Sequence, residues 1–423
     1  MQIKLVKTIL ALQPLFPIPV YFSVLTGHPP LLMSLIIAVM PMGIDYWYTR
    51  HIITRTPFDL PILIFLFGSL IGLIVAPDKG VATGALCSTI ASILVYYGIT
   101  NNRNTSTKYW LWTAGILCFI TLSLSLWFLS QSERRVLFFN QWAFNLFSRF
   151  PKTVGPVLNL HTIAGLLSVV IPALFIFAFY KTKLRIRIIA FTFCLLFIGI
   201  LFLSDSGTGW LAAFFSLAFI LVCWRRWLLF VFIPAVGLLT TGAVIFYDKI
   251  FWLQTTISTF SLMARTELWR NTIILLKGKA AILGLGQGAW FYVYGSRYGN
   301  TLDGNILAHV HNSYLQLYCD AGILGLIAMI LAAIIFTRLS INLLKVSGTN
   351  SINWIGIGLI GSIIAGAVFA IFDVNHTITY VTETGYIYLA LPLLWIGAAL
   401  ISVMSVKRSV QPTKFLWFLS KNW

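Results

Sequence analysis

Charged residues are scarce in this chain of 423 residues: they make up 9% of it, and only 11 residues are acidic. Soluble proteins carry roughly 25% charged residues, so the composition excludes an ordinary soluble enzyme. Cysteine is scarce too, and each of the five lies within or just inside an apolar run. This placement excludes a disulfide framework and a cysteine-based metal site. The first apolar run lacks an A-x-A-like cleavage site, so we expect it to be retained as a first span.

Apolar residues dominate instead, at 59% of the sequence. Apolar runs of about 18–22 residues, long enough to cross a hydrocarbon core as helices, recur along the whole chain. Because lipid offers no partner to a free backbone amide, helix is the backbone that suits such runs. We predict an all-α polytopic membrane protein with a single transmembrane domain over residues 1–423. Its twelve spans are expected at 4–25, 31–49, 58–76, 80–100, 109–130, 160–180, 185–204, 208–224, 227–246, 313–337, 353–373 and 382–405.

Basic residues gather in alternate short connections, and the short connections of the other parity hold only Lys79. The positive-inside rule therefore predicts that both termini are cytoplasmic. The net charge of +18 is dispersed in small groups between spans, so it does not indicate nucleic-acid binding. The basic groups are Lys4 and Lys7; Arg50 and Arg55; Arg103 and Lys108; Lys181, Lys183, Arg185 and Arg187; Arg225 and Arg226; Arg338 and Lys345; and Lys407, Arg408, Lys414 and Lys421.

One predicted outer connection, residues 247–312 between the ninth and tenth spans, is much longer than most of the others and holds six of the 29 basic residues. From Leu262 to Leu276 its apolar residues recur at helical spacing, which predicts a helix lying along the outer interface. Such a helix would point Arg265 or Arg270 at a membrane-embedded anion. The alternative is an interfacial helix whose arginines meet lipid headgroups.

The same connection contains a glycine motif, Gly284-Leu285-Gly286-Gln287-Gly288. It has the look of a phosphate-binding loop but lacks the lysine and serine of a Walker motif. We favour a tight reversal that returns Trp290 and Phe291 to the membrane surface. A direct phosphate role for Gly286 and Gly288 is the alternative.

His309 and His311 lie where this connection re-enters the membrane. A histidine at a helix start can act as a general base near neutral pH. A metal site is disfavoured, because the two histidines have no Asp, Glu or Cys beside them in the sequence. A purely structural histidine is the remaining alternative.

The motifs, taken in order, resemble those of the O-antigen ligase superfamily: Ala264-Arg265-Thr266-Glu267-Leu268-Trp269, the three glycines, His311-Asn312-Ser313-Tyr314-Leu315-Gln316 and Asp320-Ala321-Gly322-Ile323-Leu324-Gly325. This family includes O-antigen ligases, O-antigen and exopolysaccharide polymerases, and pilin oligosaccharyltransferases. The resemblance implies a GT-C-like, inverting glycosyltransferase that needs no metal or other cofactor. It would act on the periplasmic side of a bacterial inner membrane. The donor would be a glycan on undecaprenyl diphosphate, and the acceptor a hydroxyl of lipid A-core or another glycan.

The resemblance also implies roles for single residues. His311 would accept the proton of the acceptor hydroxyl, Arg265 would bind the donor diphosphate, and Asp320 matches an acidic position of the family. The Ser-Arg-Gly stretch of many members is replaced here by Ser204-Asp205-Ser206-Gly207, so another cation would have to take over. The candidates for that cation are Arg149, Lys152 and Arg270, and the supporting residues would be Asn312, Tyr314, Asp320, His161, Gly286 and Gly288.

Two alternatives stay open at this point. Within the family, the acceptor could make the protein a ligase, a polymerase or a protein oligosaccharyltransferase. Outside it, a small-anion transporter would need ionisable residues deep within several spans. Only Asp45, Asp205, Asp373 and Glu383 approach that description, and all lie near predicted span ends.

Overall fold

The computed structural model describes residues 9–102, 160–179, 183–245, 259–345 and 351–407, apart from isolated positions within these ranges, and short pieces between 119 and 126. The predicted span at 109–130 therefore lies largely outside the described residues, and Arg149 and Lys152 lie wholly outside them. The described helices are α2 (Ile18–Thr26), α3 (Leu31–Thr49), α4 (Asp59–Val75), α5 (Lys79–Asn101), α8 (Leu160–Phe179), α9 (Leu184–Leu203), α10 (Gly207–Trp224), α11 (Leu229–Ile245), α13 (Thr259–Leu275), α14 (Lys279–Leu283), α15 (Trp290–Tyr298), α16 (Ser313–Lys345), α17 (Ser351–Phe372) and α18 (Leu393–Lys407).

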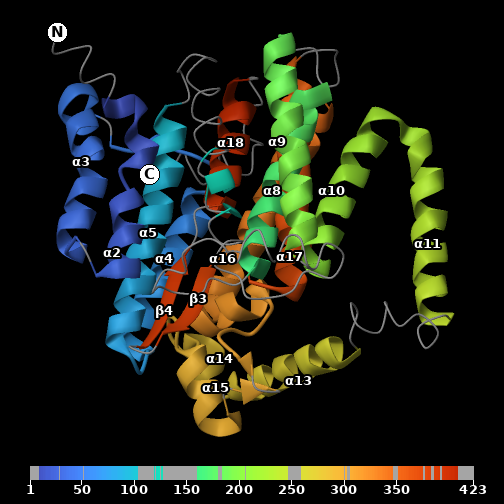
Figure 1. The fold of residues 1–423 in the computed structure, drawn as a ribbon. Coiled ribbons are helices and arrows are strands. Elements are labelled where there is room, and N and C mark those ends of the chain that lie inside the picture. The colour runs from blue at the N-terminus through green and yellow to red at the C-terminus, as the bar shows by residue number, and fades with distance from the viewer. Residues whose placement is uncertain are drawn as a thin grey trace.

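Most of these helices lie along a common axis and form one bundle (Figure 1). Six of them, α3, α5, α9, α10, α16 and α17, are long and apolar enough to cross a membrane. Shorter apolar segments lie in α4, α8, α11 and α18. The protein is thus a multi-pass α-helical membrane protein, as the sequence predicts.

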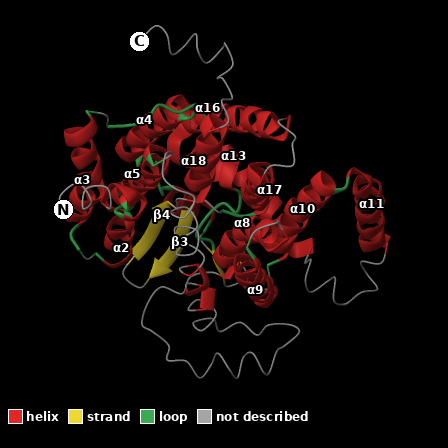
Figure 2. Cartoon of the chain, turned by 90° about the horizontal axis from the view of Figure 1, so that it is seen from above, coloured by secondary structure: helices red, strands yellow, loops and turns green. Residues whose placement is uncertain are grey.

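Two of the predicted spans differ from the structure. The first is broken into a 3₁₀ turn, η1 (Gln13–Leu15), and α2, because prolines lack the amide that a helix interior needs. The last predicted span, 382–405, is placed too early in the sequence, because α18 begins only at Leu393. Before it, β3 (Thr377–Thr382) pairs antiparallel with β4 (Gly385–Ala390). Seen down the bundle, this hairpin lies beside α2 and α5, while α11 lies at one edge (Figure 2).

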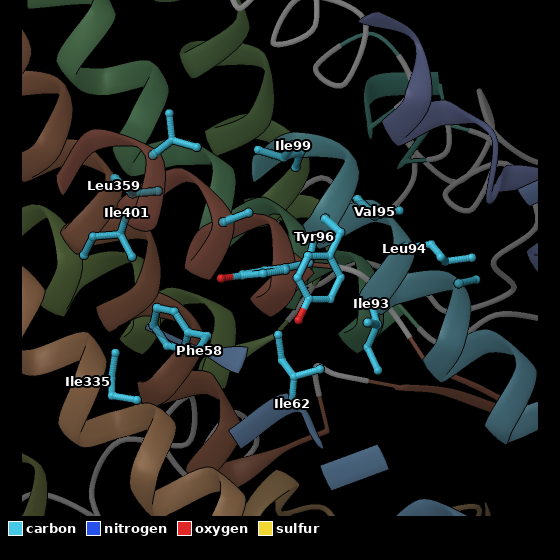
Figure 3. Close-up of a cluster of buried hydrophobic side chains, with 14 of the residues drawn as sticks. Phe58, Ile62, Ile93, Leu94, Val95, Tyr96, Ile99, Ile335, Leu359 and Ile401 are labelled. Atoms are coloured by element: carbon cyan, nitrogen blue, oxygen red, sulfur yellow. The ribbon is translucent and has the colours of Figure 1, made fainter. Parts of the chain in front are cut away.

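The largest apolar core joins α4, α5, α16 and α18 around Tyr96, which is completely buried (Figure 3). The Tyr96 hydroxyl donates to Thr56 Oγ1 at 2.6 Å, and its ring meets Trp395 edge to face. A second core surrounds Phe369 of α17 and contains residues of α8, α9 and α10. Helix α17 contributes residues to both cores, Leu359 and Ile360 to the first and Phe369 to the second, so its end is packed between them.

One end of the bundle carries the short helices α13, α14 and α15, with α13 crossing the direction of the spans (Figure 1). The helix predicted for 262–276 is confirmed as α13 (Thr259–Leu275). After α15 the chain returns through two short strands, β1 (Thr301–Leu302) and β2 (Asn305–Ile306), to His309. From there α16 runs away from this end, with a kink at Gly322 (φ 61°). The motifs of the long connection therefore meet where α16 begins.

Candidate active site

The start of α16 is fastened to the end of α17. Asn312 caps α16, because its Oδ1 accepts the Leu315 amide at 2.9 Å. Three side-chain hydrogen bonds then cross between the helices: Asn312 Nδ2 to the Ile371 carbonyl at 2.9 Å, Ser313 Oγ to the Asp373 carbonyl at 3.1 Å, and Tyr314 hydroxyl to the Ala367 carbonyl at 2.9 Å. The predicted supporting residues Asn312 and Tyr314 thus hold the histidine segment in place.

This junction brings together His309, His311 and Asp373. Asp373 Oδ1 lies 3.7 Å from His309 Nε2 and 3.4 Å from His311 Nδ1. The two imidazole rings meet edge to face, with centroids 4.2 Å apart. The Val374 amide donates to the same Oδ1 at 2.8 Å and fixes the carboxylate. The expectation drawn from the sequence, that the histidines have no carboxylate nearby, is therefore wrong, since Asp373 directly follows α17 and lies beside both of them.

His311 has a backbone conformation that is uncommon for a residue other than glycine. Among the described residues other than glycine, only Arg50 and His311 have positive φ, and that of His311 is 51°. Such conformations cost energy and are often found at active sites. The side chain of His311 is 22% exposed, whereas that of Asp373 is 3% exposed. With Nδ1 directed at the buried carboxylate, Nε2 is the nitrogen that can accept a proton from a bound molecule.

Helix α13 is attached to the histidine segment through Trp269. Its indole Nε1 donates at 3.0 Å to the carbonyl of Val310, the residue between the two histidines. Arg265 lies one turn before Trp269, on the same helix face, and is half-buried. Arg270 lies with the exposed residues on the opposite face. Of the two arginines of α13 predicted to bind the donor, only Arg265 therefore lies on the helix face that Trp269 turns toward the histidine segment. It makes no ion pair with a carboxylate in the described part of the chain.

The glycine motif is buried and its amides are already used. Leu285 and Gly286 donate to the Cys319 carbonyl at 2.7 and 3.1 Å, and Gln287 donates to the Gly72 carbonyl at 3.3 Å. Gly286 has φ 110°, and a Cβ there would lie 2.5 Å from Ala76 Cα. These amides cannot also cradle a phosphate, so the structure favours the tight reversal that the sequence suggested.

Trp290, which follows the reversal, does not return to the membrane surface as expected. It is completely buried, and its Nε1 donates to Thr272 Oγ1 of α13 at 2.9 Å. Tyr294 stacks on it, with ring centroids 4.6 Å apart. Trp290 thus belongs to the apolar core beneath α13, and it stabilises the helix that carries Arg265.

Asp320 connects the glycine motif to the histidine segment. Its Oδ1 accepts the Gly288 amide at 3.1 Å and Gln316 Nε2 at 3.2 Å. Gln316 Oε1 in turn accepts the Val310 amide at 3.3 Å. Asp320 is 3% exposed. Asp320 and Gln316 therefore link the glycine motif to the backbone between the two histidines.

An apolar cavity of about 490 Å³ lies among α4, α16, α17 and α18. Along α16 its lining extends from Ser313 to Thr337. The lining is apolar along most of this length and becomes polar next to the histidine segment, at Gln287, Ser313, Tyr314 and Asp320. A molecule with a polar head and an apolar chain would match this distribution.

Some predicted site residues cannot be placed. Arg149 and Lys152 lie outside the described residues, and His161 lies in the first turn of α8 without a described side chain. Asp373 was not among the predicted site residues, because it was weighed only as an ionisable residue of a transporter, whereas the structure places it beside both histidines. The available signal was an acidic residue at the very end of an apolar run.

Comparison with known proteins finds one family whose model matches part of the chain. Residues 192–330 match the family model described as O-antigen ligase. This match supports membership of the O-antigen ligase superfamily. The matched region runs from within α9 to the middle of α16, so it includes Arg265 and His311 but not Asp373. A search of curated proteins found no match. The family indicates a membrane enzyme of the glycosyltransferase type acting on glycan substrates.

Proposed function

We propose that the protein transfers a glycan from undecaprenyl diphosphate to a hydroxyl of lipid A-core. The observation that carries this proposal is the His311–Asp373 pair beside the inner face of α13, inside a family of glycan-transferring membrane proteins. Both termini would be cytoplasmic and the α13–α15 end would face the periplasm of an inner membrane, in agreement with the alternation of basic connections.

His311 would act as the general base. Its Nε2 accepts the proton of the acceptor hydroxyl as that oxygen attacks the anomeric carbon of the donor sugar. The bond between the anomeric carbon and the diphosphate oxygen breaks, and its electron pair leaves with the diphosphate. Attack from the face opposite the leaving group inverts the configuration. Asp373 would stabilise by its charge the imidazolium that forms, as the acid does in hydrolytic triads.

Arg265 would bind the departing diphosphate. A planar, permanently charged guanidinium can form two parallel hydrogen bonds with phosphate oxygens. Its half-buried position on the inner face of α13 supports this role, because a pre-placed cation in a partly dry site is strongly effective where negative charge develops. The apolar cavity supports a lipid-linked donor, since its polar end adjoins the histidine segment.

The direct test uses the purified protein, an undecaprenyl-diphosphate glycan and lipid A-core. We expect a glycan–lipid A-core product from the wild type and none above background from His311→Ala. Product formed only when a second glycan chain or a pilin-type peptide replaces lipid A-core would move the protein to the polymerase or protein-glycosylation branch. Transfer by His311→Ala at near wild-type rate would refute the general base.

A further inference from the structure

The spacing within the His309–His311–Asp373 cluster differs from that of hydrogen bonds. N–H···O hydrogen bonds span about 2.7–3.2 Å, whereas the two N···O distances here are 3.4 and 3.7 Å. A tetrahedral ion with ligands about 2.0–2.1 Å away places neighbouring ligand atoms roughly 3.3–3.4 Å apart. The ligand-type atoms of all three residues lie within 4.8 Å of one another. The two histidine nitrogens thus lie at distances from the shared Asp373 oxygen that suit neighbouring ligands of one small ion.

We propose that His309 Nε2, His311 Nδ1 and Asp373 Oδ1 bind a zinc-like divalent ion. Two imidazoles and one carboxylate form a ligand set that zinc uses with an open fourth position for water. Imidazole ligands favour zinc and its neighbours over Mg²⁺ and Ca²⁺, which prefer more oxygen ligands. Burial also favours binding, because the side chains of Asp373 and His309 are 3% and 10% exposed.

The ligands are held by the surrounding structure before any ion arrives. The Val374 amide fixes the carboxylate at 2.8 Å, and Ser313 Oγ holds the Asp373 backbone at 3.1 Å. The Trp269 indole holds the Val310 carbonyl between the two histidines at 3.0 Å. Pre-organised partners of this kind raise metal affinity, since little ordering entropy remains to be lost on binding.

Metal binding would inhibit glycosyl transfer, and this step rests on the proposed function. An ion on His311 Nδ1 excludes a proton from that nitrogen, so the neutral ring must carry its proton on Nε2. Nε2 then donates a hydrogen bond and cannot accept the proton of the acceptor hydroxyl. The donor would still bind, because Arg265 is not a metal ligand. The metal would therefore lower kcat through the histidine tautomer and leave the donor KM nearly unchanged.

Metal binding is measured first, without any substrate. Purified protein is stripped with EDTA and dialysed against Zn²⁺ at a series of free concentrations. We expect one zinc ion per chain in the wild type, and an affinity at least ~10-fold weaker in His309→Gln and in Asp373→Asn. Glu267→Gln is the matched control, because Glu267 is an exposed carboxylate on the outer face of α13. Equal zinc binding by the wild type and both ligand variants would overturn the site.

Activity is measured second, on the same preparations. In the wild type, Zn²⁺ should lower kcat and EDTA should restore it, with the donor KM little changed. His309→Gln should need at least ~10-fold more zinc for half-inhibition. Zinc that binds at the cluster without lowering kcat, or that raises it, would overturn the inhibitory role. If no preparation transfers glycan, the proposed function fails, yet the binding comparison still decides whether the metal site exists.

Discussion

Asp373→Asn isolates the contribution of the carboxylate that faces His311. Asparagine keeps the size of the side chain and an oxygen that can accept the Val374 amide, so the end of α17 should keep its backbone. The change removes the negative charge that would stabilise the imidazolium formed when His311 takes the acceptor proton. Asp373 would thus be a positioning residue, and its loss should lower kcat while Arg265 keeps the donor KM near its wild-type value.

The distance sets the size of the effect. Two unit charges at the observed 3.4 Å attract by about 5 kcal/mol at an effective dielectric constant of about 20. Each ~1.4 kcal/mol corresponds to a tenfold change in rate, so the upper limit is a fall of somewhat more than 10³-fold. Because His311 is 22% exposed, water replaces part of the lost stabilisation. We expect kcat to fall by about 10²–10³-fold, within the range that a general base supplies.

The assay is steady-state transfer from an undecaprenyl-diphosphate glycan to lipid A-core in detergent. Asp78→Asn is the matched control, because Asp78 is a carboxylate at the same end of the bundle that caps α5 and accepts the Tyr292 hydroxyl at 3.1 Å. Asparagine is an equally good cap, so this control should keep nearly full kcat. A kcat of Asp373→Asn within about threefold of wild type, or a fall matched by Asp78→Asn, would refute the positioning role.

Three further predictions follow from the same geometry. Arg265→Lys should lose much of the activity, since a point charge cannot replace a bidentate fork, whereas Arg270→Lys on the exposed face should keep it; equal losses would contradict the assignment by face. Gly286→Ala should lower the thermal midpoint in detergent more than Gly299→Ala. Both glycines have positive φ, but only at Gly286 would a Cβ meet backbone, so strain and overlap together should cost roughly 2–4 kcal/mol. Equal shifts would contradict the reported close approach of Gly286 to Ala76. A cysteine introduced at Lys279, in α14, should react with an impermeant reagent added to intact spheroplasts; reaction only after lysis would reverse the proposed orientation.

Much of the architecture could be predicted because hydropathy and helical periodicity are local signals. The apolar runs predicted the bundle, and the spacing from Leu262 to Leu276 predicted α13. The hairpin of β3 and β4 was missed because a short apolar run rich in β-branched and aromatic residues is compatible with either a strand or a buried helix. The burial of Trp290 was also missed, because its Thr272 partner follows from how α15 packs beneath α13. Such packing is not encoded in either segment alone.

The candidate site shows the same contrast: some of its residues could be predicted from neighbouring sequence, and one could not. His311, Asn312 and Tyr314 are adjacent in sequence, and Arg265 precedes them on a helix whose inner face can be read from its periodicity. Asp373 is about 60 residues beyond His311 and joins it only because α16 and α17 run in opposite directions, so that the start of one meets the end of the other. The hydrogen bonds that Asn312, Ser313 and Tyr314 make to carbonyls of the α17 end fix this meeting. The motif that contains the proposed base therefore also carries the contacts that place Asp373 beside it. If His311 is the base, its function depends on three neighbours that need not touch the substrate.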